Sequence, residues 1–294
     1  MLKTHVDNQI WLVHQPDHAR VSGYLAAHWG NTTFAQPGYF ASTNESPRIR
    51  QEVIQAIAEH DNGWWEWEAN PSIDPEDGLP YGLLDVGKET ADAGLQRWWL
   101  GVPRFAEQHP YMALLISYHA YWLYAFAFPD EPSHDKTFLH PLFGAPDQSS
   151  RLVSDVNLFR SFLEEQRDVQ DNLQQRLLAN PLWEDAVDPG HLYPHVRLLQ
   201  LLDAMSLLLS FGGRKETELA DVPQSHWDNR VSIRWKPLGD RRILCEPYPF
   251  AIDPLEVLLP VRILTKDFLT DALPITRLHS VPLQTVRFEL TGKK

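Results

Sequence analysis

Apolar residues recur at helical spacing along most of the first 220 positions. Val21, Leu25 and Trp29 follow one another four residues apart, which places them on one face of a helix. Similar spacing predicts helices at about residues 17–29, 47–62, 89–107, 110–128, 152–178 and 192–211. These helices account for most of the chain up to residue 222, so the sequence predicts a mainly α fold, a multi-helix bundle.

The pattern changes near residue 227 to short runs rich in β-branched and aromatic residues. The runs lie at residues 231–235, 241–250, 255–264 and 285–290, and Pro, Gly and Asp residues separate them. They predict a small antiparallel sheet, which a further apolar run at residues 9–13 could join. We therefore expect an α+β chain in two parts. A helical domain with an N-terminal strand would span residues 1–222, and a small β-rich extension packed on it would span residues 223–294.

The composition limits the classes of partner. With 43% hydrophobic and 22% charged residues, the bulk of this 294-residue chain is too apolar for intrinsic disorder. A formal net charge of -13 has the wrong sign for extended nucleic-acid binding, although an acidic pocket can accept a small anion through a bound divalent cation. We expect a small-molecule substrate. The sequence leaves the oligomeric state open, a homo-oligomer included.

Cysteine usage and hydropathy bear on location. Cys245 is the single cysteine and cannot form an internal disulfide, which fits a reducing cytoplasm. The first residues lack the continuous apolar run of a secretory signal. The most apolar stretch, residues 112–128, falls short of the roughly 18 residues needed to span a bilayer and contains His119. We therefore expect a cytoplasmic protein with no membrane partner, in which this stretch is a buried helix.

A few ionisable residues lie on helix faces that should be buried. His18 lies on the same helix face as Val21 and Leu25. The pair His60 and Asp61 follows the last apolar residue on the buried face of the second predicted helix. His119 has only apolar neighbours three and four positions away, and Asp203 has Leu199 and Leu207 four positions to either side. Even a neutral polar group costs roughly 2 to 7 kcal/mol to bury without a partner. These side chains therefore need partners.

The simplest common partner is a divalent metal ion. Imidazole and carboxylate groups from several helices can converge on one cation, and we predict His18, His60, Asp61 and Asp203 as its ligands. This mixed set does not choose among Mn, Mg, Fe, Ni, Co and Zn. Other partners stay open: a backbone carbonyl for His18, a helix-capping role for the His-Asp pair, and an arginine for Asp203. His119 could be a second-metal ligand, a general acid or a core residue.

The order His18, His60-Asp61, Asp203 resembles the ligand order of the HD superfamily of metal-dependent phosphohydrolases. The segments DHARVSGYLAAHWG, AIAEHDNGW and LLQLLDAMSLLLS carry this resemblance. The whole chain also resembles an uncharacterised bacterial domain-of-unknown-function family, through QPDHARVSG, HDNGWWEW, SYHAYWLY, LLDAMSLLLS and CEPYPF. The resemblance implies an HD-like helical bundle that hydrolyses a small phosphoester-like substrate with a metal-activated water. Asp61 would orient that water or bridge a second ion, and His119 would protonate the leaving group or bind the second metal.

The sequence departs from the HD pattern after the His-Asp pair. Many active members have a lysine there that can meet a phosphate, whereas this chain has Trp64. An indole cannot supply positive charge. Trp64 therefore weakens the prediction of a phosphate-containing substrate and favours stacking on a planar or sugar-like ligand. We therefore predict Trp64, Trp67 and Glu68 as substrate-binding residues, with loop packing as the alternative. The basic residues that could replace the lysine are Arg20, Lys88 and Arg97, although we expect each of them to be a solvated surface charge.

Two other functional classes remain. A dinuclear iron site completed by His119 and another histidine would suit an oxygenase of the HD type. A catalytically silent site would suit a ligand-binding or assembly protein, with Trp64 and Trp67 holding the ligand.

Overall fold

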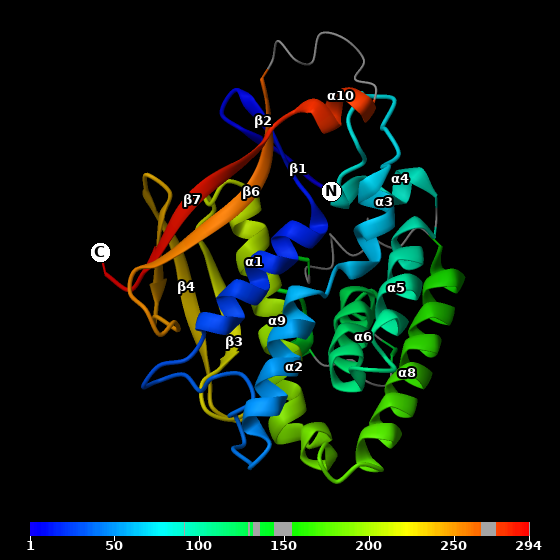
Figure 1. Ribbon diagram of the computed structural model, residues 1–294, viewed down its shortest axis with the longest axis vertical. Coiled ribbons are helices and arrows are strands. Elements are labelled where there is room, and N and C mark those ends of the chain that lie inside the picture. Colours follow the sequence, from blue (N-terminus) through cyan, green and yellow to red (C-terminus); the bar gives the residue numbers. More distant parts are fainter. Residues whose placement is uncertain (91, 129, 132–135, 144–154, 266–274, 294) are drawn as a thin grey trace.

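The computed structural model describes residues 1–293 except residues 91, 129, 132–135, 144–154 and 266–274 (Figure 1). The longer helices are α1 (Gln15–His28), α2 (Ser46–Ala58), α5 (Ala93–Arg104), α6 (Pro110–Ala125), α8 (Val156–Leu178) and α9 (Pro189–Ser210). The shorter ones are α3 (Trp65–Ala69), α4 (Val86–Glu89), α10 (Ile275–Ser280) and the 3-10 turns η1 (Asn62–Trp64), η2 (Leu83–Asp85), η3 (Lys136–Phe138) and η4 (Glu184–Val187). The predicted long helices are therefore present, except that α4 and α5 replace a single helix at 89–107. The predicted start at residues 152–154 lies outside the described residues.

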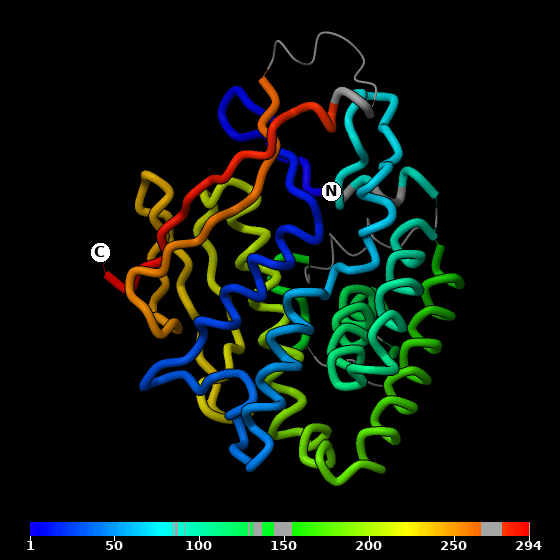
Figure 2. The backbone as a smooth tube through the Cα atoms, in the orientation of Figure 1, coloured from blue at the N-terminus to red at the C-terminus, as the bar shows by residue number. Residues whose placement is uncertain are grey.

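The strands come from both ends of the chain. They are β1 (Leu2–Val6), β2 (Gln9–Val13), β3 (Thr217–Pro223), β4 (Arg230–Gly239), β5 (Arg242–Glu246), β6 (Leu255–Thr265) and β7 (Leu283–Thr291). Within the described residues they form one seven-stranded sheet in the order β1-β2-β6-β7-β5-β4-β3. All neighbours are antiparallel except β5 and β7, which are parallel. Figure 2 shows the N-terminal hairpin, in blue, on the same sheet as the C-terminal strand, in red.

The fold is therefore α+β, and the prediction of a mainly α bundle with a small antiparallel sheet extension is wrong. The sheet is mixed and large, and its Trp235 and Phe288 belong to the same hydrophobic core as Leu202 of α9. The sequence pattern missed β1 and β3, which are the two edge strands. Because an edge strand has a sheet neighbour on only one side, it can be short and polar, and its local pattern is weak. The predicted domain boundary at residue 222 stays a prediction, and β3 runs across that position.

The prediction that the first apolar run joins the C-terminal strands is confirmed. Strand β2 has the predicted bounds and pairs with β6, with Trp11 opposite Ile263. This pairing places the start of α1 directly beside the sheet. Figure 1 shows α1 and α9 between the sheet and the other long helices. Side chains of α1 and α9 that point away from the sheet therefore face the interior of the helical layer.

Helix α6 runs through the helical layer. It corresponds to the most apolar stretch of the sequence, and nearly all of its residues are buried against the surrounding helices. Its neighbours include α2, α5, α8 and α9. Among the described residues, none of the helices combines the length and the apolar character needed to cross a bilayer. The expectation of a buried helix is confirmed.

A buried histidine in this layer makes stability depend on pH. The backbone N–H of Gly38 donates to His195 Nε2 at 2.8 Å, so Nδ1 carries the proton and donates to the Tyr111 hydroxyl at 2.8 Å. Burial, assisted by the nearby His191, lowers the pKa of His195 well below its usual 6.5. The folded state therefore binds fewer protons than the unfolded state in acid. The contribution of neutral His195 is fully present above pH 6.5 and is lost as the pH falls below that value.

We expect the free energy of unfolding to fall as the pH drops from 7.5 to 5.5. Each such histidine contributes up to about 1.4 kcal/mol per pH unit in this range. His195→Gln should remove about 1.4 kcal/mol of the total change between pH 7.5 and 5.5, because a histidine with a pKa of 6.5 in the unfolded chain binds on average half a proton over this range. Urea unfolding at several pH values measures the difference. The control is His226→Gln, at an exposed histidine, which should keep the wild-type slope. An unchanged slope in His195→Gln would contradict this account.

Candidate metal centre

Four long helices bring the predicted ionisable residues together. His18 lies on α1, His60 and Asp61 directly follow α2, His119 lies on α6 and Asp203 on α9. All are buried, and Asp61 is the most exposed of them at 7%. Their polar atoms form two overlapping sets in which potential ligand atoms lie within 4.8 Å of one another. One set is His18, His60 and Asp61, and the other is His60, His119 and Asp203.

The distances suit a shared cation. His18 Nε2 lies 2.8 Å from Asp61 Oδ2, and His60 Nε2 lies 3.8 Å from the same oxygen. His60 Nε2 also lies 3.5 Å from Asp203 Oδ1. Donor atoms bound to one ion at about 2.1 Å lie within roughly 4.2 Å of one another. These three separations fall within that limit. The four predicted ligands nevertheless divide between the two sets, because Asp203 belongs to the set with His60 and His119 and not to the set with His18 and Asp61.

Several atoms of the cluster have no hydrogen-bond partner. His60 Nε2, His119 Nδ1 and Asp203 Oδ1 are fully buried and unpaired among the described residues. Buried polar atoms are nearly always hydrogen-bonded in folded proteins, so unpaired ones indicate a missing partner. Two of these three atoms, His60 Nε2 and Asp203 Oδ1, face each other. A cation between them would satisfy both.

Two serines fix the orientation of His18. Ser206 Oγ donates its single proton to the carbonyl oxygen of Asp203 at 2.8 Å and accepts from Ser22 Oγ at 2.9 Å. His18 Nδ1 lies 2.9 Å from the same Oγ and must therefore be the donor. The Nε2 lone pair of a neutral His18 then points at the Asp61 carboxylate. A positive charge, either a proton or a metal ion, is needed between them.

His60 is held in the same tautomer by the backbone. Its Nδ1 lies 2.8 Å from the carbonyl oxygen of Ile57, which can only accept, so Nδ1 carries a proton. This contact arises because the carbonyls of the last turn of α2 have no partner within the helix. Nε2 is thereby left to face Asp61 and Asp203. Metal-binding histidines commonly donate their other ring N–H to a carbonyl in this way.

The electrostatics of the cluster reflect close packing of opposite charges. Burial alone would lower the pKa of His60, but Asp61 and Asp203 raise it to about 9. Burial would raise the pKa values of both aspartates, yet the facing histidines hold both below the usual range. Burial lowers the pKa of His119 to about 3, so its ring is neutral near pH 7. Without metal, the two carboxylates are thus ionised and a proton on His60 offsets part of their charge.

A sixth residue, His140, joins the cluster. It follows η3, and its Nε2 lies 3.1 Å from Asp203 Oδ2. His119 Nε2 approaches the same oxygen at 3.5 Å. No sequence pattern distinguishes His140, because it lies in a loop without periodicity and among other loop histidines. Only the packing of that loop against α9 reveals it.

The three predicted substrate-binding residues lie beyond the His-Asp pair. The rings of Trp64 and Trp67 meet edge to face, and the Arg97 guanidinium packs against both, 5.1 and 5.3 Å from their centroids. Glu68 is buried and accepts from the backbone N–H of Gln15 at 3.0 Å. It also forms an ion pair with the Met1 amine at 2.8 Å. These contacts are structural, and a role in substrate binding stays a prediction.

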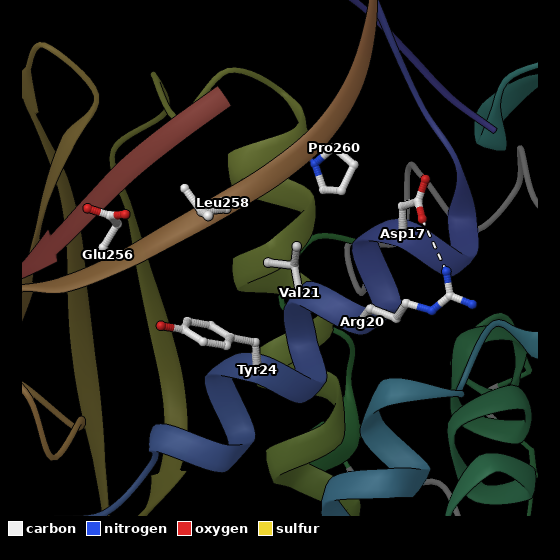
Figure 3. Close-up of a pocket in the computed structure, with 7 residues that line it drawn as sticks. All are labelled: Asp17, Arg20, Val21, Tyr24, Glu256, Leu258 and Pro260. Atoms are coloured by element: carbon white, nitrogen blue, oxygen red, sulfur yellow. Dashed lines mark hydrogen bonds and ion pairs between the residues drawn. The ribbon is translucent and has the colours of Figure 1, made fainter. Parts of the chain in front are cut away.

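The three basic residues considered for phosphate binding are all engaged elsewhere. Arg97 is buried and paired with Glu89 at 2.9 Å, which corrects the expectation of a solvated surface charge. Lys88 pairs with the carboxylates of the neighbouring loop and η2, namely Asp74, Glu76 and Asp85. Arg20 contacts Asp17 at 3.3 Å and borders a pocket of about 290 Å³ between α1 and β6 (Figure 3). No cluster residue lines that pocket.

Fold and site together define an α+β protein with a buried histidine-aspartate cluster at the junction of four helices. The chain belongs to the family described as protein of unknown function DUF3891, whose model matches residues 1–266. This confirms the expected domain-of-unknown-function family, whereas membership of the HD superfamily stays a prediction. No curated protein and no solved structure matches the chain.

Proposed function

We propose that this protein is a metal-dependent hydrolase whose ion is held by His18, His60, Asp61 and Asp203. The observation that carries the proposal is that His60 Nε2 and Asp203 Oδ1 are buried 3.5 Å apart and that neither has a hydrogen-bond partner in the part of the chain that the structure describes. The tautomers add support, because the contacts of His18 and His60 leave both Nε2 atoms facing carboxylates. Nitrogen and oxygen donors of this kind suit divalent ions, with the identity open among Mn, Mg, Fe, Ni, Co and Zn.

The chemistry would combine the ion with the residues around it. When bound, a divalent ion would lower the pKa of a water molecule at the site toward about 7 and so supply a nucleophile. Asp61 is the most exposed member of the cluster, so we place the approach of water and substrate on its side. Its carboxylate would orient the water. A neutral His119 is suited to ligation or to hydrogen bonding, and a proton-donating role would require its pKa to rise from about 3 on substrate binding.

The proposed substrate is a small phosphoester or related ester. Because Arg20, Lys88 and Arg97 already have carboxylate partners, negative charge on the substrate would be met by the ion. This favours small substrates whose reacting group reaches the ion directly. It disfavours large polyanions, in line with the net charge of -13.

The test combines metal analysis with an activity screen. Protein purified without chelators and then loaded with Mn is assayed against a panel of small phosphoesters and carboxylic esters, beside His60→Ala and Asp61→Ala. We expect turnover by the intact protein and its loss in both variants. The exposed His226→Gln is the matched control and should keep full activity. Bound metal without turnover would instead favour the ligand-binding module, and dioxygen consumption by iron-loaded protein would favour the oxygenase.

A further inference from the structure

The two overlapping ligand sets share one histidine nitrogen. His60 Nε2 belongs both to the set with His18 and Asp61 and to the set with His119 and Asp203. His60 Nδ1 is already committed to the Ile57 carbonyl. An imidazole nitrogen has a single lone pair in the ring plane and can bind only one ion. The two sets therefore cannot each hold an ion with three protein ligands at the same time.

His140 is the residue that could have supplied the missing ligand for a second ion. Its environment argues against that role. The backbone N–H of Leu142 donates to His140 Nδ1 at 3.3 Å, and a backbone N–H can only donate. The ring proton of a neutral His140 must therefore be on Nε2. That nitrogen lies 3.1 Å from Asp203 Oδ2, so it donates to the carboxylate and has no lone pair for a metal.

The tautomer of His140 is thus opposite to those of His18 and His60. In their neutral forms His18 and His60 carry the proton on Nδ1 and direct the Nε2 lone pair into the cluster, whereas neutral His140 directs an N–H into it. The His140 ring also stacks on Phe143, with centroids 4.8 Å apart, which limits its rotation. Without His140, a second ion would have only His119 Nε2 and Asp203 Oδ2 as ligands among the described side chains.

We infer that the cluster holds a single divalent ion and that His140 is a positioning residue, a hydrogen-bond donor that orients the Asp203 carboxylate. This inference rests on the proposed function for the presence of the ion. By binding Oδ2, His140 turns the unpaired Oδ1 toward His60 Nε2. The ion would then have His18, His60 and Asp61 of the first set as ligands, with Asp203 Oδ1, 3.5 Å from His60 Nε2, as the fourth. Coordination sites beyond these four are left for water and substrate.

Two measurements on the intact chain test this inference. The first is long-range ¹H–¹⁵N NMR of metal-free protein near pH 7, with His140→Gln used to assign the ring. We expect an unprotonated Nδ1 and a protonated Nε2 for His140. The reverse tautomer would overturn its role as a donor, whatever the protein does with metals.

The second measurement is metal stoichiometry and affinity, by elemental analysis and Mn titration. We expect one ion per chain. His140→Gln keeps an N–H donor near the position of Nε2 and should retain near wild-type affinity, whereas His140→Leu should weaken binding roughly 10- to 100-fold. Circular dichroism melting confirms that each variant is folded.

The outcomes separate the two proposals. Two ions per chain, or equal loss of affinity in His140→Gln and His140→Leu, would overturn the single-ion inference and leave the metal-dependent function standing. No bound ion in any preparation would overturn the proposed function and the stoichiometry together. The NMR result would still decide the role of His140.

Discussion

Asp203→Asn is expected to abolish divalent metal binding at micromolar concentrations. The substitution keeps the shape of the side chain but replaces the anionic oxygen that faces His60 Nε2 at 3.5 Å with a neutral amide. Loss of an outer-shell partner alone costs roughly 10- to 100-fold in metal affinity, and the loss of a ligand should cost more. Isothermal titration with Mn, supported by elemental analysis, measures the change.

The metal-free form of Asp203→Asn should also be less stable than metal-free wild type. Asp203 helps to raise the pKa of the buried His60 to about 9, so the charge on His60 depends in part on it. Removing one partner of a buried ion pair typically lowers the free energy of unfolding by about 3 to 5 kcal/mol. The loss is smaller if His60 gives up its proton, because a neutral imidazole leaves no unpaired buried charge. Asp168→Asn, at an exposed aspartate of α8, is the control and should change neither property. Wild-type metal affinity in Asp203→Asn would remove Asp203 from the ligand set.

Gly63→Ala is expected to destabilise the protein severely. A Cβ at Gly63 would lie 1.8 Å from the carbonyl oxygen of Arg97 and 2.7 Å from its carbonyl carbon. Both are backbone atoms of α5, so the clash cannot be relieved by a side-chain rotation. Overpacking of this kind costs about 3 kcal/mol or more when the backbone must move. Because Gly63 follows the His-Asp pair by two residues, separating η1 from α5 should also displace Asp61.

Urea unfolding at pH 7.5 measures this effect. Gly82→Ala is the matched control, because the nearest atoms to its new Cβ belong to the side chains of Asp85 and Lys3, at 3.1 Å and beyond. These side chains can shift. A Gly63→Ala protein as stable as Gly82→Ala would show that the close approach of η1 and α5 is not a constraint.

The sequence alone determined the long helices and the ionisable residues that lie on their buried faces. Apolar positions predicted α1, α2, α6, α8 and α9 within a few residues. Helices α2 and α8 bury one face, which the 3.6-residue period records, whereas α6 and α9 are buried nearly all round and are apolar along most of their length. The same periodicity singled out His18, His60, Asp61, His119 and Asp203 as ionisable residues on buried faces. The structure brings all five into one cluster, and metal binding by them remains to be tested.

The tertiary structure decided the size of the sheet and the roles within the cluster. Edge strands β1 and β3 have little local pattern, and the parallel pairing of β5 with β7 depends on contacts between distant segments. Local periodicity cannot report such contacts. The role of His140 depends on the Leu142 N–H and on Asp203, which is 63 residues away. A sequence can show that a histidine will be buried, but the donors and acceptors around the folded ring decide which nitrogen carries the proton.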